Sequence, residues 1–413
     1  MEQQDFELIL INIAGEDRPG LTSVLTEILG RHDALILDIG QADIHHTLSL
    51  GILFKTTSEK SGTIMKELLF KANEMNVSIR FSPITVEAYD NWVARQGKNR
   101  WIITMLGRTT TAKQIAAVSR VVMQQGLNID AIQRLTGRMP LHEDEEAKSK
   151  SCIEFSVRGT PTDKAMMQKE LMELASSLDF DISMQEDTIF RRSRRLICFD
   201  MDSTLIETEV IDELAIKAGV GDEVKAITEA AMRGEIDFKE SFVQRVALLK
   251  GLDVSVMREI AENLPMSEGI ERLMAVLKRT GYKIAILSGG FTYFGNYLKQ
   301  KFGIDYVYAN ELEVEDGKLT GRHLGDIVDG KRKAELLRLI AQVENVDIMQ
   351  TIAVGDGAND LPMLSTAGLG IAYHAKPKVK ADAQQSISTI GIDGVLYFMG
   401  FKDSFITENH IRY

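Results

Sequence analysis

The chain has 413 residues, 44% of them hydrophobic, which is enough for two or three globular domains. A net charge of −12 disfavours general nucleic-acid binding, although a local basic patch stays open. Two cysteines, Cys152 and Cys198, provide no disulfide framework, and the sequence shows neither a signal-peptide pattern nor an apolar stretch of about 18 residues. We therefore expect a soluble cytoplasmic protein with no membrane or nucleic-acid partner.

The first part of the chain predicts a small α/β unit, which we assign to residues 1–90. From Phe6 to about Val86 the pattern favours strand, helix, two strands, helix, strand. The segment from Gly15 to Gly20 is expected to form a turn into the first helix. Pro19 should lie in the first turn of that helix, where proline is tolerated.

A second unit, assigned to residues 97–188, repeats this order of elements with a period of about 90 residues. Strands are expected at 99–106, 128–136, 151–158 and 180–186, and helices at 111–125 and 161–178. The charged run 141–150 between the middle strands predicts a solvated loop. The basic run 191–195 predicts a solvated junction to the second half of the chain.

The second half contains three short apolar runs that each end in a polar cluster. Continuous apolar runs bounded by glycine fit strands that are buried on both faces of a parallel sheet. The runs and their clusters are Leu196–Phe199 with Asp200-Met201-Asp202, Ile284–Leu287 with Ser288-Gly289-Gly290, and Thr351–Val354 with Gly355 to Asp360. Because ligands bind beyond the carboxyl ends of such strands, we expect these clusters to meet in one crevice.

The residue types in this crevice suit phosphoryl transfer. Asp200 can act as a covalent nucleophile toward phosphorus, and Asp202 can donate a proton to the leaving oxygen and later accept one from water. Close carboxylates need a cation, and Mg²⁺ held by Asp200 and Asp356 would supply it. Ser288 and the amides after it can bind phosphate oxygens.

A positive charge for the phosphate is expected from the helix that precedes the last of these strands. Lys331 and Lys333 both stand at the start of that helix. Spacing alone leaves open which of the two reaches the crevice.

Four segments resemble the motifs of the haloacid dehalogenase-like phosphatases: Asp200 to Thr204, Ser288 to Gly290, Lys333, and Gly355 to Asp360. Glu207 to Ala215 and Met232 to Leu249 resemble, more narrowly, the phosphoserine phosphatases of that superfamily. The resemblance implies a Rossmann-like parallel sheet in a domain at 194–400, with a small helical cap at about 211–268. It also implies Mg²⁺-dependent hydrolysis of O-phospho-L-serine through an aspartyl phosphate, the final step of serine biosynthesis.

The same resemblance implies a role for each matching residue. The catalytic residues would be Asp200, Asp202 and Lys333, and the metal would be held by Asp200, the Asp202 backbone carbonyl and Asp356, with Asp360 in support. Substrate would be bound by Glu209, Met232, Phe238, Arg245, Ser288, Gly289 and Asn359. Glu209 and Arg245 would recognise the amino-acid end, because serine presents an ammonium and a carboxylate.

The first half resembles tandem ACT domains, the small ferredoxin-like modules that sense amino acids. The resemblance rests on the order of elements and on Asp17 to Leu21 at the first strand-to-helix turn. Gly107 to Thr110 occupy the corresponding turn of the second unit and lack the acidic-Arg-Pro-Gly pattern. The resemblance implies an amino-acid effector and a homodimer.

Two other functions remain open from the sequence. One is a related phosphatase that acts on another small phosphorylated metabolite or transfers the phosphoryl group to an acceptor alcohol. The chain could also be chiefly an amino-acid sensor with secondary enzymatic activity, although retention of every catalytic residue type speaks against a vestigial enzyme.

Overall fold

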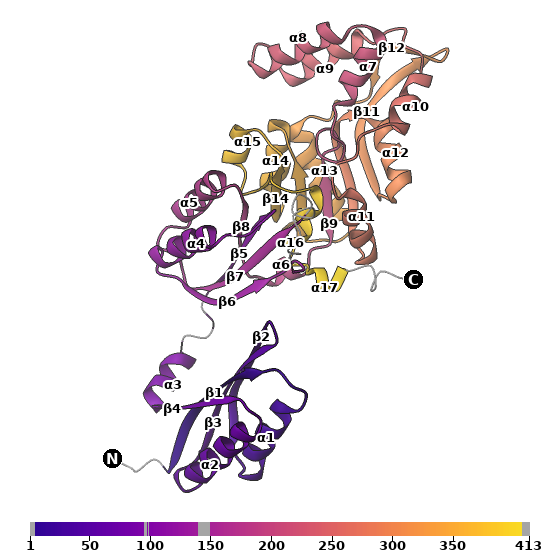
Figure 1. The fold of residues 1–413 in the computed structure, drawn as a ribbon. Coiled ribbons are helices and arrows are strands. Elements are labelled where there is room, and N and C mark those ends of the chain that lie inside the picture. The colour runs from indigo at the N-terminus through magenta and orange to yellow at the C-terminus, as the bar shows by residue number, and fades with distance from the viewer. Residues whose placement is uncertain (1–4, 95–96, 98, 139–148, 407–413) are drawn as a thin grey trace. The chain divides into compact units, whose positions relative to one another are not determined.

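The computed structural model describes residues 5–94, 97, 99–138 and 149–406, and Met232 without its side chain. The chain forms two compact units, residues 1–98 and 99–413, which are described separately (Figure 1). Of the charged run 141–150, predicted to be a loop, only Ser149 and Lys150 belong to the described residues. Among the residues described, no helix has the length and apolar character needed to span a membrane.

The first unit is a four-stranded antiparallel sheet in the order β2-β3-β1-β4. Its elements are β1 (Phe6–Glu16), α1 (Leu21–Arg31), β2 (Leu35–Ile44), β3 (Thr47–Thr57), α2 (Ser58–Glu74), β4 (Ser78–Ile84) and α3 (Val86–Val93). Ile9, Ile11 and Ile13 alternate along β1 and form a core with the buried residues of α1 and α2. The predicted βαββαβ order is confirmed, and α3 was not predicted.

The start of α1 differs from the prediction. The helix begins at Leu21, and Gly20 before it has a φ of 91°, a left-handed conformation that favours glycine. Pro19 therefore precedes the helix and does not lie in its first turn.

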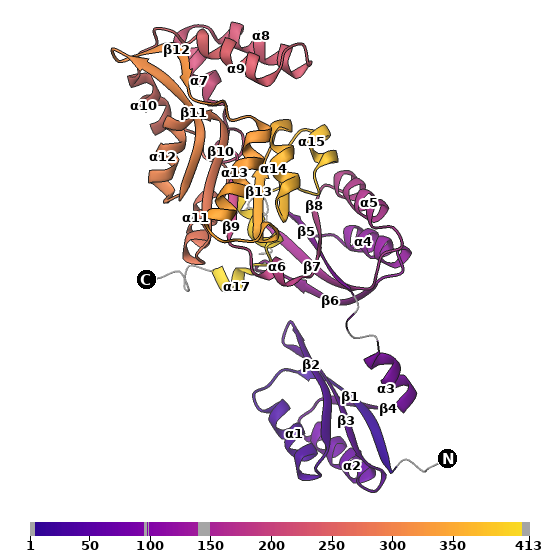
Figure 2. The same cartoon turned by 180° about the vertical axis from the view of Figure 1, so that it is seen from behind.

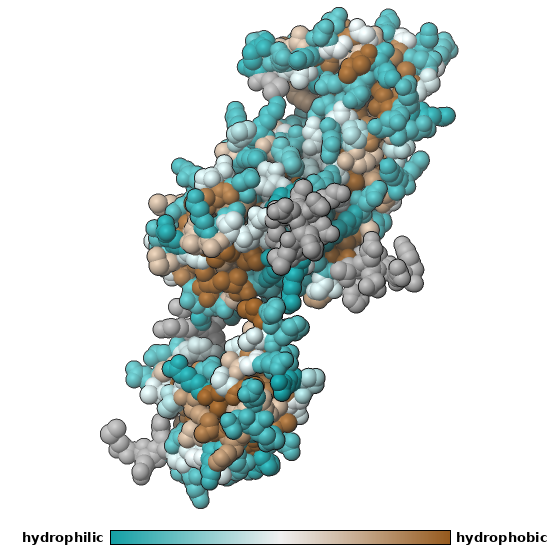
Figure 3. Space-filling model, in the orientation of Figure 1, coloured by the Kyte–Doolittle hydropathy of each residue, from teal (hydrophilic) through white to brown (hydrophobic). Residues whose placement is uncertain are grey.

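The second ACT-like unit has the same topology, with the sheet order β6-β7-β5-β8. Its elements are β5 (Arg100–Gly107), α4 (Ala112–Gln124), β6 (Asn128–Arg134), β7 (Ser151–Arg158), α5 (Lys164–Ser177) and β8 (Asp181–Glu186), followed by α6 (Ile189–Arg192). Buried residues of α4 and α5 pack on one face of the sheet. The edge strand β6 exposes Ile132, and Figure 3 shows hydrophobic surface over this part of the sheet.

The remaining residues form a seven-stranded sheet in the order β12-β11-β10-β9-β13-β14-β15, with β9 at its centre. All neighbours are parallel except β11 and β12. The strands are β9 (Leu196–Phe199), β10 (Lys283–Phe291), β11 (Tyr306–Glu315), β12 (Lys318–Leu324), β13 (Thr351–Gly355), β14 (Leu369–Tyr373) and β15 (Gln385–Ile387). The predicted Rossmann-like parallel sheet is confirmed.

Helices cover both faces of this sheet (Figures 1 and 2). Ile197 and Phe199 of β9 face the core shared with α11 and α12, while Leu196 and Cys198 face the core shared with α13 and α14. This explains why the strand is apolar at every position. These helices and the later ones are α11 (Ile270–Arg279), α12 (Thr292–Phe302), α13 (Gly330–Val343), α14 (Leu361–Thr366), α15 (Pro377–Asp382), α16 (Val395–Phe398) and α17 (Asp403–Ile406), with 3₁₀ turns at Ile348–Gln350, Ala358–Asp360 and Ile392–Gly394.

Four helices between β9 and α11 form the cap: α7 (Val210–Ala218), α8 (Gly221–Met232), α9 (Phe238–Ala247) and α10 (Ser255–Glu262). The β11–β12 hairpin, which was not predicted, reaches this cap (Figure 1). The Gly251 amide donates to the Leu319 carbonyl at 2.8 Å, and the Val254 amide donates to the Gly317 carbonyl at 3.0 Å. The cap is therefore joined to the hairpin as well as to its two chain connections.

The second ACT-like unit shares a core with the phosphatase-like part. Leu106, Leu135 and Cys152 pack in the same buried cluster as α11 and α16. Between β8 and β15, the Met184 amide donates to Gln385 Oε1 and Gln385 Nε2 donates to the Met184 carbonyl, both at 3.0 Å. Residues 99–413 therefore fold as one compact unit. The sequence analysis did not predict this, because it treated the second ACT-like unit as a domain separate from the phosphatase-like part.

Candidate active site

A cavity of about 760 Å³ lies at the carboxyl ends of β9, β10 and β13 and is bordered by the cap. The sequence-predicted residues that line it are Asp200, Asp202, Glu209, Phe238, Arg245, Gly289, Asp356 and Asn359. Lys333 and Ser288 are fully buried just behind the wall. Met232 ends α8, and its side chain lies outside the described residues. The sheet therefore brings the predicted clusters together.

Asp200 directly follows β9 and is held by a buried lysine. Lys333 Nζ lies 2.9 Å from Asp200 Oδ1 and 2.7 Å from Asp360 Oδ1. Burial opposes the charge of Lys333, but the two carboxylates outweigh it and raise the pKa of the ammonium group above its usual range. Of the two lysines that the spacing left open, the structure therefore places Lys333 in the site, whereas Lys331 is exposed.

Asp202 is held in a different environment. Its Oδ1 accepts a hydrogen bond from the Val210 amide at 3.1 Å, and its other oxygen lies against Gly290, where any β-carbon would come within 2.2 Å. Burial, with repulsion from Glu209 and Asp200, raises the pKa of Asp202 well above its usual range. An environment that favours the protonated form of a carboxyl suits a general acid.

Three carboxylates form a cluster of possible metal ligands. Oxygens of Asp200, Asp356 and Asp360 lie within 4.8 Å of one another. Burial and the neighbouring charges of Asp200 and Asp360 raise the pKa of Asp356 to about 8, so Lys333 does not compensate the whole cluster. Carboxylate oxygens are ligands that Mg²⁺ prefers, and the residues present fit such an ion. The Asp202 side chain is not part of this cluster.

The cap side of the cavity carries charges of both signs. Glu209 precedes α7 and accepts a hydrogen bond from the Ser203 hydroxyl at 2.7 Å. Arg245 lies on α9, and its Nε donates to the Ser241 carbonyl at 3.3 Å. Burial lowers the pKa of this guanidinium, while the charges of Glu209 and Asp212 oppose that change and keep it protonated.

Phe238 and Ser288 complete the walls in different ways. The ring of Phe238 stacks on Phe242 with ring centres 6.5 Å apart and lies against Gly289. The structure extends β10 through Ser288, whereas the sequence predicted that the strand ends before it. Ser288 Oγ accepts a hydrogen bond from the Gly290 amide at 2.9 Å, so it shapes the irregular carboxyl end of β10. As placed, Ser288 supports this end of the strand and does not line the cavity.

Sequence reasoning missed several residues of the site. Thr204 donates a hydrogen bond from Oγ1 to Asp356 Oδ1 at 3.2 Å, and Ser203, with a φ of 56°, turns the chain back toward Glu209. Both residues belong to the Asp200–Thr204 motif, and this membership is the sequence signal that could have identified them. Lys376 and Lys378, near the start of α15, also line the cavity, and no local sequence pattern predicted their presence there.

Family models match three parts of the chain: an ACT domain at residues 7–82, an ACT domain at residues 100–185, and a haloacid dehalogenase-like hydrolase at residues 197–365. A phosphoserine phosphatase of Streptomyces coelicolor is 37% identical over 97% of this chain and 93% of its own length. The chain belongs to the phosphoserine phosphatase family.

Other members of the phosphoserine phosphatase family and its superfamily support this assignment. Phosphoserine phosphatase SerB2 of Mycobacterium tuberculosis is 38% identical over 95% of this chain and 93% of its own length. The crystal structure of a probable phosphoserine phosphatase from Vibrio cholerae matches 75% of this chain and 88% of that chain, with 35% identity and a TM-score of 0.57. The haloacid dehalogenase-like resemblance and the tandem ACT arrangement predicted from the sequence are both confirmed.

Proposed function

We propose that this protein hydrolyses O-phospho-L-serine to L-serine and phosphate with the help of Mg²⁺, as the final step of serine biosynthesis. The observation that carries the proposal is one cavity lined both by a carboxylate that can act as a nucleophile and by a glutamate and an arginine on the cap side. Asp200, bound by Lys333, supplies the first, and Glu209 and Arg245 supply the second. The relatives' names support the choice of substrate.

In the first half of the proposed reaction, a carboxylate oxygen of Asp200 attacks phosphorus and forms an aspartyl phosphate. The P–O bond to serine breaks, and Asp202 donates its proton to the leaving alkoxide oxygen. In the second half, Asp202 accepts a proton from water, which attacks the aspartyl phosphate and regenerates Asp200. A bound Mg²⁺ ion, held by Asp200, Asp356 and the Asp202 carbonyl with Asp360 in support, would neutralise the anionic phosphate.

The chain's own residues would orient the substrate. Arg245 presents a planar pair of donors to the serine carboxylate, and Glu209 accepts hydrogen bonds from its ammonium group. Lys333 holds Asp200 in place and offers its positive charge to a phosphate oxygen. Gly289, Phe238 and Asn359 line the cavity, where the Gly289 amide would bind a phosphate oxygen and the Phe238 ring would shield the substrate.

Phosphate release tests the proposal. Wild-type protein with Mg²⁺ is expected to favour phosphoserine over phosphothreonine and sugar phosphates, and Asp200→Asn should lower turnover by at least about three orders of magnitude. Chelation of divalent cations should stop turnover and re-addition of Mg²⁺ should restore it. A tenfold preference for a sugar phosphate would refute the substrate, and an active Asp200→Asn variant would refute the nucleophile.

The proposal extends to the partners of the chain. We assign ACT-like domains at residues 1–90 and 97–188 and the phosphatase domain at 194–400, with an amino-acid effector at the first ACT-like domain. Leu35, Ile39 and Ile44 are exposed on the edge strand β2, which favours a homodimer. The two free thiols, Cys152 and Cys198, are buried, which suits a reducing cytoplasm.

A further inference from the structure

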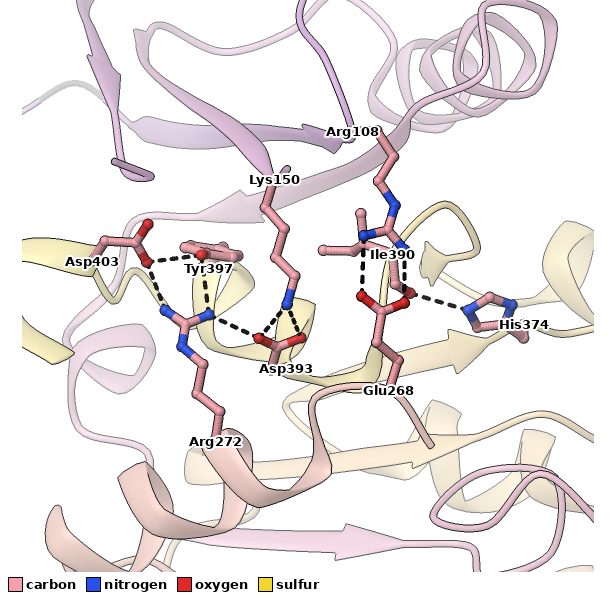
Figure 4. A network of polar contacts seen from close by, with 9 residues as sticks. All are labelled: Arg108, Lys150, Glu268, Arg272, His374, Ile390, Asp393, Tyr397 and Asp403. Atoms are coloured by element: carbon pink, nitrogen blue, oxygen red, sulfur yellow. Dashed lines mark hydrogen bonds and ion pairs between the residues drawn. The ribbon is translucent and has the colours of Figure 1, made fainter. Parts of the chain in front are cut away.

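Arg108 connects the second ACT-like unit to the phosphatase-like part. It lies on the turn between β5 and α4, where its Nη1 donates to Glu268 Oε1 at 3.0 Å and its Nη2 donates to Glu268 Oε2 at 2.7 Å (Figure 4). Paired guanidinium–carboxylate bonds of this kind fix direction as well as distance. Mutual hydrogen bonding lowers the pKa of Glu268 and raises that of Arg108, so both groups stay charged.

Glu268 stands where the chain returns from the cap, directly before α11. The returning residues 265–267 run beside the outgoing residues 204–207, and we call these two segments the hinge pair. The Glu207 amide donates to the Pro265 carbonyl at 2.9 Å, and the Ser267 amide donates to the Leu205 carbonyl at 3.1 Å. Glu268 therefore directly follows the hinge pair, which connects the cap to the rest of the phosphatase-like part.

The hinge pair reaches the catalytic carboxylates through two hydrogen bonds. Ser267 Oγ donates to the Thr204 carbonyl at 2.7 Å, and Thr204 Oγ1 donates to Asp356 Oδ1 at 3.2 Å. Ser267 and Thr204 are buried, with 4% and 0% of their surface exposed, so water does not replace these bonds. A continuous set of contacts thus runs from Arg108 to Asp356.

The backbone around Glu268 is also fixed. Its carbonyl accepts a hydrogen bond from the Ile392 amide at 2.8 Å, and a β-carbon on Gly269 would come within 2.3 Å of Asp393. The fully buried Asp393 accepts from Lys150 at 2.6 and 2.7 Å and from Arg272 at 2.8 Å (Figure 4). Lys150 belongs to the same ACT-like unit as Arg108, so that unit holds this region at two points.

We infer that Arg108 is a positioning residue for catalysis, which acts through Glu268 to keep the hinge pair and the Thr204–Asp356 hydrogen bond in their working arrangement. The turn that carries Arg108 is the one that lacks the acidic-Arg-Pro-Gly pattern of the first unit. In the second unit this turn serves as a contact with the phosphatase-like part. The inference rests on the proposed function only for the choice of assay substrate.

The test compares Arg108→Ala, Glu268→Ala, the double variant and the exchanged pair Arg108→Glu with Glu268→Arg in the full chain. Each single variant should lower kcat for phosphoserine by about 3- to 30-fold with a smaller change in KM. The double variant should lose no more than either single variant, and the exchanged pair should recover part of the loss. Amide hydrogen exchange in residues 204–207 and 265–267 should become faster in the single variants.

Arg158→Ala is the matched control, because Arg158 pairs with Asp130 at 3.1 Å and both residues lie in the second ACT-like unit. It should leave kcat and hinge exchange unchanged. Unchanged kcat and exchange in Arg108→Ala would overturn the inference, as would fully additive losses in the double variant. A loss of kcat that only follows the fraction of unfolded protein would also overturn it.

The proposed function and this inference fail separately. If wild-type protein prefers another phosphomonoester, the substrate proposal falls. The same variants assayed with that preferred substrate would still show the loss expected from Arg108.

Discussion

Lys333 is a fully buried ammonium between two carboxylates, and this single side chain determines much of the charge balance of the site. One cation cannot neutralise Asp200, Asp356 and Asp360 together. The remaining negative charge is what prepares the cluster for a divalent cation.

The first prediction concerns this lysine. Lys333→Ala should lower the free energy of unfolding by about 3–5 kcal/mol in metal-free buffer, because it leaves buried carboxylates without a partner. Thermal or denaturant unfolding measures the change, and phosphatase activity should be lost. Lys331→Ala is the control, since that side chain is exposed two residues away. Equal stability of the two variants would contradict the placement of Lys333.

Arg245 carries the second prediction, which concerns substrate selection. Arg245→Ala should lower kcat/KM for phosphoserine by about 10- to 150-fold, the loss expected for hydrogen bonds to a charged group. Hydrolysis of phosphoethanolamine, which has no carboxylate, should change little. Lys217→Ala is the control, because Lys217 is exposed in the cap and pairs with Glu259. Equal losses of kcat/KM on both substrates would mean that Arg245 does not recognise the carboxylate of phosphoserine.

At the scale of elements, strands β8 and β15 join the second ACT-like unit to the central sheet. The carboxylate of Asp181 accepts hydrogen bonds from the Ser388 and Thr389 amides at 2.7 and 2.9 Å and from the Thr389 hydroxyl at 2.6 Å. Asp181 is 2% exposed, so removing its carboxylate takes a buried acceptor away from these three donors.

The third prediction follows from this junction. Asp181→Ala should lower the free energy of unfolding by about 1–3 kcal/mol, because three donors lose their buried acceptor. Thermal unfolding of the full chain measures the effect. Asp130→Ala removes an aspartate of the same unit that is paired near the surface, and it should change stability much less. A similar change in both variants would show that the junction contributes little.

The sequence predicted those parts of the fold and the site that a local residue pattern encodes. Three apolar runs ending in polar residues predicted that Asp200, Ser288 and Asp356 meet, because parallel strands share one carboxyl edge. The choice between Lys331 and Lys333 needed the structure, since it depends on how the helix is rotated. The β11–β12 hairpin was missed because its role depends on a partner in the cap. Arg108 and Glu268 are 160 residues apart, and no local pattern links them.

At the scale of the whole molecule, the first ACT-like unit differs from the second in how it is built into the chain. Residues 1–98 form their own compact unit with their own core. The second unit contributes Leu106, Leu135 and Cys152 to the core of the phosphatase-like part. Its removal would expose apolar surface that is buried in the full chain.

The fourth prediction uses this difference. Deletion of residues 1–98 should leave a folded, active phosphatase that has lost its response to the proposed amino-acid effector, for which serine is the amino acid tested. Deletion of residues 1–188 should give aggregated or unstable protein. Size-exclusion chromatography, circular dichroism and phosphate release measure the outcomes. A stable and fully active protein lacking residues 1–188 would refute the structural role of the second unit. Unchanged serine sensitivity after deletion of 1–98 would refute the effector proposal.

The hairpin that joins the cap restricts how substrate can enter. Moving the whole cap outward would either break its backbone hydrogen bonds with the β11–β12 hairpin or displace β11 relative to β10, whose carboxyl end lines the cavity. Among the residues that the structure describes, no backbone hydrogen bond joins the turn between α8 and α9 to the hairpin, and this turn leads directly into Phe238. Admission of substrate and release of serine are therefore expected to depend on a local displacement of this turn, which faster amide exchange at 233–237 than at 251–254 would reveal.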